Sequence, residues 1–159
     1  MLRSDGEGFD LAEQLDRAIA QIGWLGQRQF TQLLAEARFD LTIPQFHTLM
    51  HLSQCGDYCK MSDLARATYQ SAASLTGVVD RLLEKRLVAR VRSEGDRRQV
   101  VVTVTDYGRV LLKEIKQARR AEMQAALQRI PPAEIQELLR LLDAVLDGML
   151  HAVEAREGR

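Results

Sequence analysis

The stretch SAASLTGVVDRLLEKRLVARVRSEGDRRQVVVTVTDYG, residues 71–108, decides the fold of this chain. Its first half repeats apolar residues at three- and four-residue steps, which predicts an amphipathic helix from about Ser71 to Lys85. The apolar side of this helix consists of Ala72, Leu75, Val78, Val79, Leu82 and Leu83. Two runs rich in β-branched residues follow, VARVRS and QVVVTVT, and the polar segment EGDRR joins them. Because Val and Thr favour pleated backbone, these runs predict a β-hairpin directly after the helix.

Further helices are expected on the N-terminal side of this stretch. Apolar spacing from Phe9 to about Arg38 predicts a long amphipathic helix. A second helix is expected in DLTIPQFHTLMHLS, because Thr42 can cap it and Gln45 follows three residues later, as in a capping box. Its expected apolar stripe consists of Phe46, Leu49 and Met50. MSDLARAT predicts a short third helix with Leu64 turned inward, and TYQS predicts the turn that follows.

Two long helical patterns follow the hairpin, in residues 110–130 and 133–153, and the pair Pro131-Pro132 separates them. Their leucine-rich stripes are wide for helices of so small a protein that face solvent. We therefore expect them to bury this surface against a second copy of the chain. The alternative is an intramolecular bundle with the first helix.

The order of these elements is that of a winged helix-turn-helix, mainly α-helical with a small β-hairpin wing. In such a unit the helix after the turn enters the DNA major groove, so its outer side must be small or polar. The residues expected on that side are Gln70, Ser71, Ala73, Ser74, Thr76, Gly77 and Arg81. An ordinary solvated helix would also be polar there, but Glu and Lys would be more usual than Gly and Ala.

The formal net charge of the chain is zero, but its distribution is uneven. Residues 1–59 hold 4 Lys/Arg and 8 Asp/Glu, residues 60–105 hold 9 and 5, and residues 106–159 hold 9 and 9. A basic middle segment is typical of a protein that binds double-stranded DNA, although ordinary surface variation would explain the same excess.

The hairpin concentrates this positive charge. The expected DNA contacts of the wing and its flanks are Arg90, Arg92, Asp96, Arg97 and Arg98. Arginines suit the negative potential of a narrow minor groove, and Asp96 can hold the Arg98 guanidinium in one orientation. Lys85 and Arg86 are expected to add affinity that depends on salt concentration.

These motifs resemble those of the MarR family of bacterial transcriptional regulators. The matching stretches are LTIPQFHTLMHL, SDLARAT, VVDRLLEKRLVAR and EGDRRQVVVTVTDYG, and the last carries the Asp-x-Arg wing pattern at Asp96 and Arg98. The resemblance implies a homodimer that binds a palindromic operator, usually to repress transcription, and it implies no enzyme activity. Residues 1–40 and 106–159 would form the dimerisation region, and residues 41–105 the DNA-binding lobe.

One position departs from the family pattern. Where the family usually has glycine after the recognition helix, this chain has Arg86. A left-handed residue at the end of a helix is easy for glycine and costs about 1 kcal/mol for a residue with a Cβ. Either Arg86 adopts this conformation, or the helix ends differently.

The chain also places four metal-binding residue types at four-residue spacing: His47, His51, Cys55 and Cys59. Gly56 interrupts the helix on which they would share one side. The favoured interpretation is a capped helix with two partly buried thiols and two histidines beside the core, with no metal or other cofactor. The alternative is a metal-responsive or thiol-redox-responsive regulator that uses both thiols with both histidines.

Control by a small molecule is the usual expectation from the family resemblance. An aromatic wall with a few polar groups would hold an aromatic or acidic effector, and Trp24, His47 and His51 are candidates for it. The alternative places Trp24 in a dimer contact.

Composition excludes several other classes of protein. No apolar run is long enough for a membrane span, and the first ten residues lack the apolar core of a signal peptide. Two cysteines are too few for a disulfide framework, so we expect a cytoplasmic protein. No glycine-rich phosphate loop and no hydrolase or metalloprotease motif is present. A helical interaction module without DNA binding remains the competing class.

Overall fold

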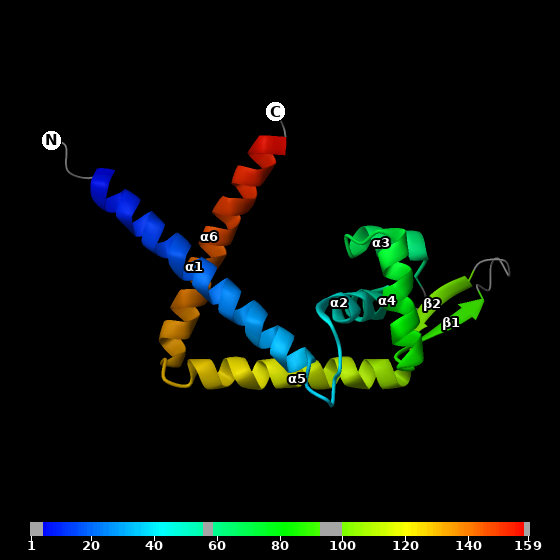
Figure 1. The fold of residues 1–159 in the computed structure, drawn as a ribbon. Helices are drawn as coiled ribbons and strands as arrows, with labels where there is room; N and C mark the ends of the chain where they lie inside the picture. The colour runs from blue at the N-terminus through cyan, green and yellow to red at the C-terminus, as the bar shows by residue number, and fades with distance from the viewer. Residues whose placement is uncertain (1–4, 56–58, 93–99, 158–159) are drawn as a thin grey trace. The chain divides into compact units, whose positions relative to one another are not determined.

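The computed structural model describes residues 5–55, 59–92 and 100–157 (Figure 1). The elements in these ranges are α1 (Asp5–Leu34), α2 (Ile43–Gln54), α3 (Met61–Ala67), α4 (Ala72–Glu84), β1 (Val88–Arg92), β2 (Val100–Val104), α5 (Asp106–Leu127) and α6 (Pro132–Glu157). This mainly α-helical fold with one hairpin confirms the predicted fold class. None of the described helices is long and apolar enough to cross a membrane.

The chain divides into two compact units, one ending at Arg119 and the other beginning at Arg120. The first unit contains α1 to β2 and most of α5. The second contains the last residues of α5, followed by α6. The division falls inside α5, whereas the expected dimerisation region contains this whole helix together with α6.

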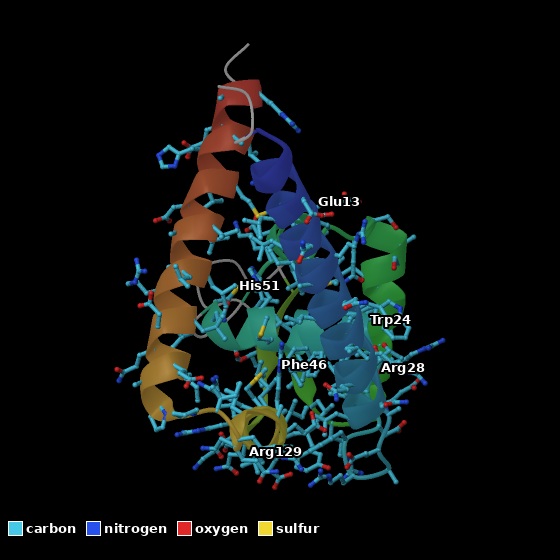
Figure 2. The ribbon with its side chains drawn as sticks, turned by 90° about the vertical axis from the view of Figure 1, so that its left-hand side faces the viewer. Glu13, Trp24, Arg28, Phe46, His51 and Arg129 are labelled. Carbon is cyan, nitrogen blue, oxygen red and sulfur yellow. The ribbon has the colours of Figure 1, made fainter. Side chains whose placement is uncertain are left out.

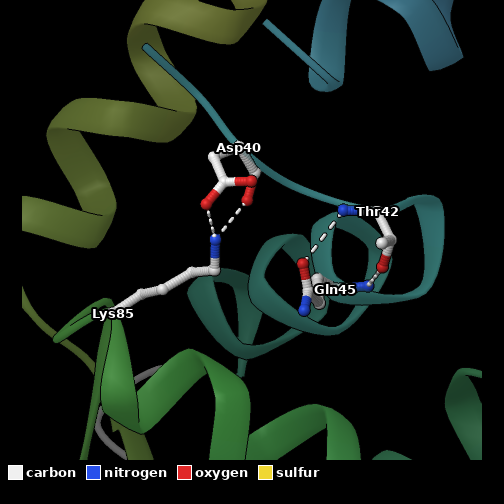
Figure 3. A network of polar contacts seen from close by, with 4 residues as sticks. All are labelled: Asp40, Thr42, Gln45 and Lys85. Atoms are coloured by element: carbon white, nitrogen blue, oxygen red, sulfur yellow. Dashed lines mark hydrogen bonds and ion pairs between the residues drawn. The ribbon is translucent and has the colours of Figure 1, made fainter. Parts of the chain in front are cut away.

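The start of α2 is built as its sequence predicts. The backbone N–H of Thr42 donates to Oε1 of Gln45 over 2.9 Å, and the N–H of Gln45 donates to the Thr42 hydroxyl over 3.5 Å (Figure 3). The predicted capping box is therefore confirmed. It satisfies two backbone groups that a helix start would otherwise leave without partners.

Arg86 ends α4 in the left-handed conformation, with φ 58°. The N–H of Arg86 donates to the carbonyl of Leu83 over 2.9 Å, and the N–H of Leu87 donates to that of Leu82 over 3.0 Å. This pair of bonds is a Schellman motif, the usual ending for a helix that closes on glycine. Of the two expected alternatives, the chain takes the one in which an arginine accepts the strain.

The hairpin is antiparallel, with Val88 opposite Val104 and Arg92 opposite Val100. It leads directly into α5, whose first turn is capped by Thr105: the Gly108 N–H donates to the Thr105 hydroxyl over 3.0 Å. A Cβ at Gly108 would collide with the backbone carbonyl of Leu87, so only glycine fits here. Because Thr105 caps the helix, α5 begins at Asp106, earlier than the expected start at residue 110.

The core of the first unit lies where α2, α3 and α4 meet the hairpin and α1. Leu49, Leu64, Leu75, Val79 and Leu82 have no exposed surface. The predicted apolar sides of α2 and α4 are largely confirmed, with two corrections. Met50 is 37% exposed and Leu52 of the next turn is buried in its place. Ala72 is exposed, because it stands in the first turn of α4, beyond the reach of the core.

Candidate nucleic-acid interface

The outer side of α4 is small, open and polar. Ala73, Ser74, Thr76, Gly77 and Arg81 are exposed, while Leu75, Val79 and Leu82 are buried on the opposite side. A Cβ at Gly77 would meet no atom within 4 Å. The side chain of Ser71 caps the helix by accepting the N–H of Ser74 over 3.2 Å. This distribution leaves a helix face on which a second macromolecule can come close to the backbone of α4.

A shallow hollow of about 330 Å³ extends this face to the start of α2. It is lined by Thr42, Pro44, Gln45, Ala73, Ser74, Gly77, Val78 and Arg81. Among the described residues, Arg81 is therefore the one long cationic side chain of the hollow. The predicted α4 residues are brought together on one surface, with the exceptions that follow.

Gln70 does not belong to the exposed face of α4. The helix begins at Ala72 with Ser71 as its cap, so Gln70 lies in the preceding turn. Its Nε2 donates to the hydroxyl of Thr48 on α2 over 3.0 Å, and Thr48 is fully buried. The prediction that Gln70 shares the outer face of the helix is wrong. The residue instead connects the turn to α2, which helical periodicity does not reveal because Gln70 precedes the helix cap.

Tyr69, which is not among the predicted DNA contacts, is an exposed aromatic residue of the same turn. It is 98% exposed and holds a left-handed backbone with φ 52°. An aromatic residue in the turn before the candidate recognition helix is the sequence signal for it, whereas its positive φ is visible only in the structure. Its hydroxyl can donate to a phosphate.

Two of the expected DNA-contacting cations have acidic partners within the protein. Nη2 of Arg90 on β1 lies 2.6 Å from Oδ1 of Asp80 on α4, and both side chains are about half exposed. The ammonium group of Lys85 donates to the carboxylate and to the backbone carbonyl of Asp40 (Figure 3). Arg90 and Lys85 therefore also fix the positions of neighbouring elements, whereas Arg86 and Arg81 are exposed.

The tip of the hairpin falls outside the described residues. This applies to Asp96, Arg97 and Arg98, so the proposed contact of Asp96 with Arg98 stays a prediction. Arg92 is described as the last residue of β1, opposite Val100. Strands β1 and β2 thus fall within the two runs that predicted the hairpin.

Comparison with known proteins matches this arrangement. A model of the MarR family matches residues 39–99. The HTH-type transcriptional regulator YfiV of Bacillus subtilis is 32% identical over 113 residues, which are 69% of this chain and 70% of YfiV. The chain belongs to the MarR family. The HTH-type transcriptional repressor NicR of Pseudomonas putida is 28% identical over 143 residues, which are 90% of this chain and 89% of NicR.

The fold agrees with the family assignment. The crystal structure of wild-type MarR from E. coli matches this chain with a TM-score of 0.64 at 26% identity, over 83% of this chain and 96% of that MarR chain. This MarR-family chain is therefore a winged helix-turn-helix protein and a DNA-binding transcriptional regulator. The β1–β2 hairpin is its wing, and α4 is the helix that directly precedes this wing.

The MarR-family chain has a cavity of about 460 Å³ between α1, α2 and α5. Its lining residues are Phe30, Phe46, Met50, Ser53, Gln54, Leu112, Lys113, Ile115, Lys116 and Arg119. Trp24, His47 and His51 are absent from this lining, so they do not line this cavity as the sequence suggested. Trp24 is 61% exposed and lies beside Arg28, whose guanidinium carbon is 5.4 Å from the ring centroid (Figure 2). Spacing along one helix could not reveal a cavity that three helices build.

The two thiols of the MarR-family chain lie together, and the two histidines do not join them. Cys55 Sγ is 3.0 Å from Cys59 Sγ. Within the described ranges, no three His, Cys, Asp or Glu side chains gather as a metal site requires. Burial, the hydrogen bond with Cys55 and the nearby charges of Cys55 and Asp63 raise the pKa of the Cys59 thiol to about 12.

Proposed function

We propose that this MarR-family regulator is a homodimeric repressor. Each protomer would insert α4 into the major groove of a palindromic operator and lay its wing over the adjacent minor groove. The observation that carries this proposal is the open face of α4, with Gly77, Ala73 and Arg81 exposed beside the hairpin. The naming of NicR as a transcriptional repressor supports the sign of regulation.

A dimer is favoured by the exposed apolar surface of the terminal helices. Helix α6 exposes Leu138, Leu139, Leu141, Leu142, Leu146, Met149, Leu150 and Val153, each by 42% or more. Helix α1 exposes Leu11, Leu15, Ile22 and Leu25 by 45% or more. Apolar side chains at this density usually mark a protein interface. Residues 1–40 and 106–159 are accordingly the proposed dimerisation region, and residues 41–105 the proposed DNA-binding lobe.

The DNA-binding step is tested with duplexes selected from a random-sequence library by the protein itself. We expect the selected sequences to contain two inverted half-sites spaced by about one helical turn or a small multiple of it. Arg81→Ala should weaken binding to the selected duplex by about tenfold or more, in line with about 1–3 kcal/mol for one good base contact. Arg140→Ala, an equivalent change on α6, is the matched control and should leave binding unchanged. Selection of no common sequence would contradict the proposal.

The proposed effector is a small acidic aromatic molecule bound in the cavity between α1, α2 and α5. The rings of Phe30 and Phe46 pack edge to face with centroids 4.9 Å apart and provide an apolar wall. Lys113, Lys116 and Arg119 are three cationic residues of the same lining. A volume of about 460 Å³ lies within the usual range for a small-molecule site.

Calorimetric titration with benzoate, an aromatic carboxylate, tests this site. We expect binding that Lys116→Gln weakens, because the charge opposite the carboxylate is removed, and that Lys60→Gln outside the cavity leaves unchanged. Bound benzoate should also lower affinity for the selected duplex, and it can do so only by as much as it prefers the DNA-free arrangement of the lobes. Equal benzoate affinity in the wild type and in Lys116→Gln would contradict the proposed pocket.

A further inference from the structure

The contact between the two thiols joins two elements of the DNA-binding lobe. Cys55 is the C-cap of α2, and its N–H donates to the carbonyls of His51 and Leu52. Cys59 pairs with β2: its N–H donates to the carbonyl of Val102 over 3.1 Å, and the Val102 N–H donates back over 3.3 Å. The sulfur atoms, 3.0 Å apart, therefore lie between the end of the helix and the sheet of the wing.

Both thiols are free, and they differ in accessibility. Cys59 is 6% exposed, whereas Cys55 is only partly buried. An oxidant from solution therefore meets Cys55 first. Because the Cys59 sulfur already touches the Cys55 sulfur, it is placed to attack Cys55 and displace a group attached to it. A disulfide requires a separation of about 2.05 Å, so the two sulfur atoms need to approach by only about 1 Å.

We propose that Cys55 and Cys59 form a reversible intramolecular disulfide by exchange with a low-molecular-weight disulfide, and that this bond lowers the affinity of the regulator for its operator. In the first step the Cys55 thiol loses its proton and attacks one sulfur of the small disulfide, whose S–S bond breaks, and the released small thiol takes up that proton. In the second step the Cys59 sulfur loses its proton and attacks the Cys55 sulfur. The second small thiol then leaves with that proton, so two protein thiols and one disulfide become one protein disulfide and two small thiols.

The effect on DNA binding follows from the position of the bond and rests on the proposed function. Helix α2 packs against α4 and against β2. Moving Cys59 toward the end of α2 also moves Val102, because the backbones of the two residues are hydrogen-bonded to each other. The wing thereby shifts relative to α4. Because α4 and the wing must contact the same duplex, a change in the distance between them weakens their fit to the DNA. We expect operator affinity to fall by about fivefold or more, the lower bound of ordinary coupling between sites.

The test equilibrates the full-length protein in buffers with graded ratios of oxidised to reduced glutathione. Acid quenching, alkylation of free thiols and mass spectrometry should show a species that has lost the two thiol hydrogens and carries no glutathione. Binding to the selected duplex is measured at the same ratios, and its decrease should follow the appearance of the disulfide. Reduction with dithiothreitol should restore both.

Cys55→Ser is the matched variant, because it keeps a small polar side chain at a partly buried position and leaves the buried Cys59 in place. It should bind the duplex like the reduced wild type and should not respond to the glutathione ratio. Absence of the internal disulfide at every ratio would overturn the inference, as would a disulfide that leaves affinity within twofold of the reduced protein. If the reduced protein selects no duplex, the proposed function fails and the effect on DNA fails with it, while the mass spectrum still decides whether the disulfide forms.

Discussion

At the scale of single residues, Arg86 shows how far a chain can depart from its family pattern and keep the fold. The Schellman bonds at the end of α4 are made although the residue with positive φ carries a Cβ. The strain is tolerated because Leu87 behind it is buried in the core and fixes the direction of the chain. The presence of arginine where the family usually has glycine therefore strains the backbone at this one position.

Arg86→Gly should raise the free energy of unfolding by about 0.5–1 kcal/mol, because relief of left-handed strain outweighs the entropy cost of glycine. Urea denaturation measures this change. Arg86→Ala retains the Cβ and should give no such gain. Equal stabilisation by both variants would show that the charge of Arg86, and not its backbone conformation, is the source of the strain.

The raised pKa of the Cys59 thiol predicts a loss of stability at alkaline pH. In the folded protein burial raises this pKa from 9.0 to about 12, with further contributions from Cys55 and from Asp63. The unfolded chain therefore loses the proton first, so this contribution is complete below pH 9 and is lost as the pH rises from about 9 toward 12. Denaturation under reducing conditions between about pH 8 and pH 10.5 should show a steeper fall for the wild type than for Cys59→Ala. The same dependence of stability on pH in both proteins would contradict the assignment of this loss to Cys59.

At the scale of elements, α4 must fill the core with one side and leave its other side open to another molecule. Its buried side fills the core, and its open side contains a glycine that costs helix stability and that no contact within the described residues requires. A residue that weakens a helix without a packing reason points to a requirement from outside the molecule. Close approach of DNA to the backbone is such a requirement.

Gly77→Ala should therefore change stability and DNA binding in opposite directions. The free energy of unfolding should rise by about 0.5–1 kcal/mol, because alanine is the better helix former and its methyl group meets open space. Affinity for the selected duplex should fall, because the same methyl group occupies the surface that approaches the bases. Thermal unfolding and a mobility shift at one stated salt concentration measure the two effects. Unchanged DNA affinity would argue against insertion of this face into the groove.

At the scale of the whole molecule, the exposed leucines of α6 predict that the chain pairs with a second copy of itself. Leu146→Glu places a charge at a residue that is 54% exposed in the single chain. We expect it to convert the protein from dimer to monomer in sedimentation, because burial of an unpaired carboxylate in an interface is unfavourable. DNA affinity should fall with it, since one lobe then binds without the gain from a linked second lobe.

Arg140→Ala on the same helix is the control for this change. Arg140 forms an exposed pair with Glu137 of its own helix, with Nη2 to Oε1 at 2.6 Å, and such pairs contribute little. It should sediment as the wild type does. A dimer of unchanged strength in Leu146→Glu would place the interface elsewhere.

Features encoded by neighbouring residues were determined by the sequence alone. The capping box of Thr42 and Gln45 spans four residues, the apolar side of α4 follows from helical periodicity, and the hairpin follows from β-branched runs on either side of a polar turn. The first two depend on residues within one or two helical turns, and the hairpin pairs residues at most 16 positions apart. The residue patterns that specify them can therefore be recognised without knowing how the rest of the protein packs.

Contacts between distant parts of the chain were decided only by the tertiary structure. Gln70 bonds Thr48 across 22 residues, Arg90 pairs with Asp80 of another element, and the cavity takes its walls from three helices. The sequence placed four potential metal ligands in series, yet packing brought together only the two thiols. Helical spacing gives the direction of a side chain about its own axis. Which neighbour it meets depends on the angle and distance at which elements pack, and these are set by the whole core at once.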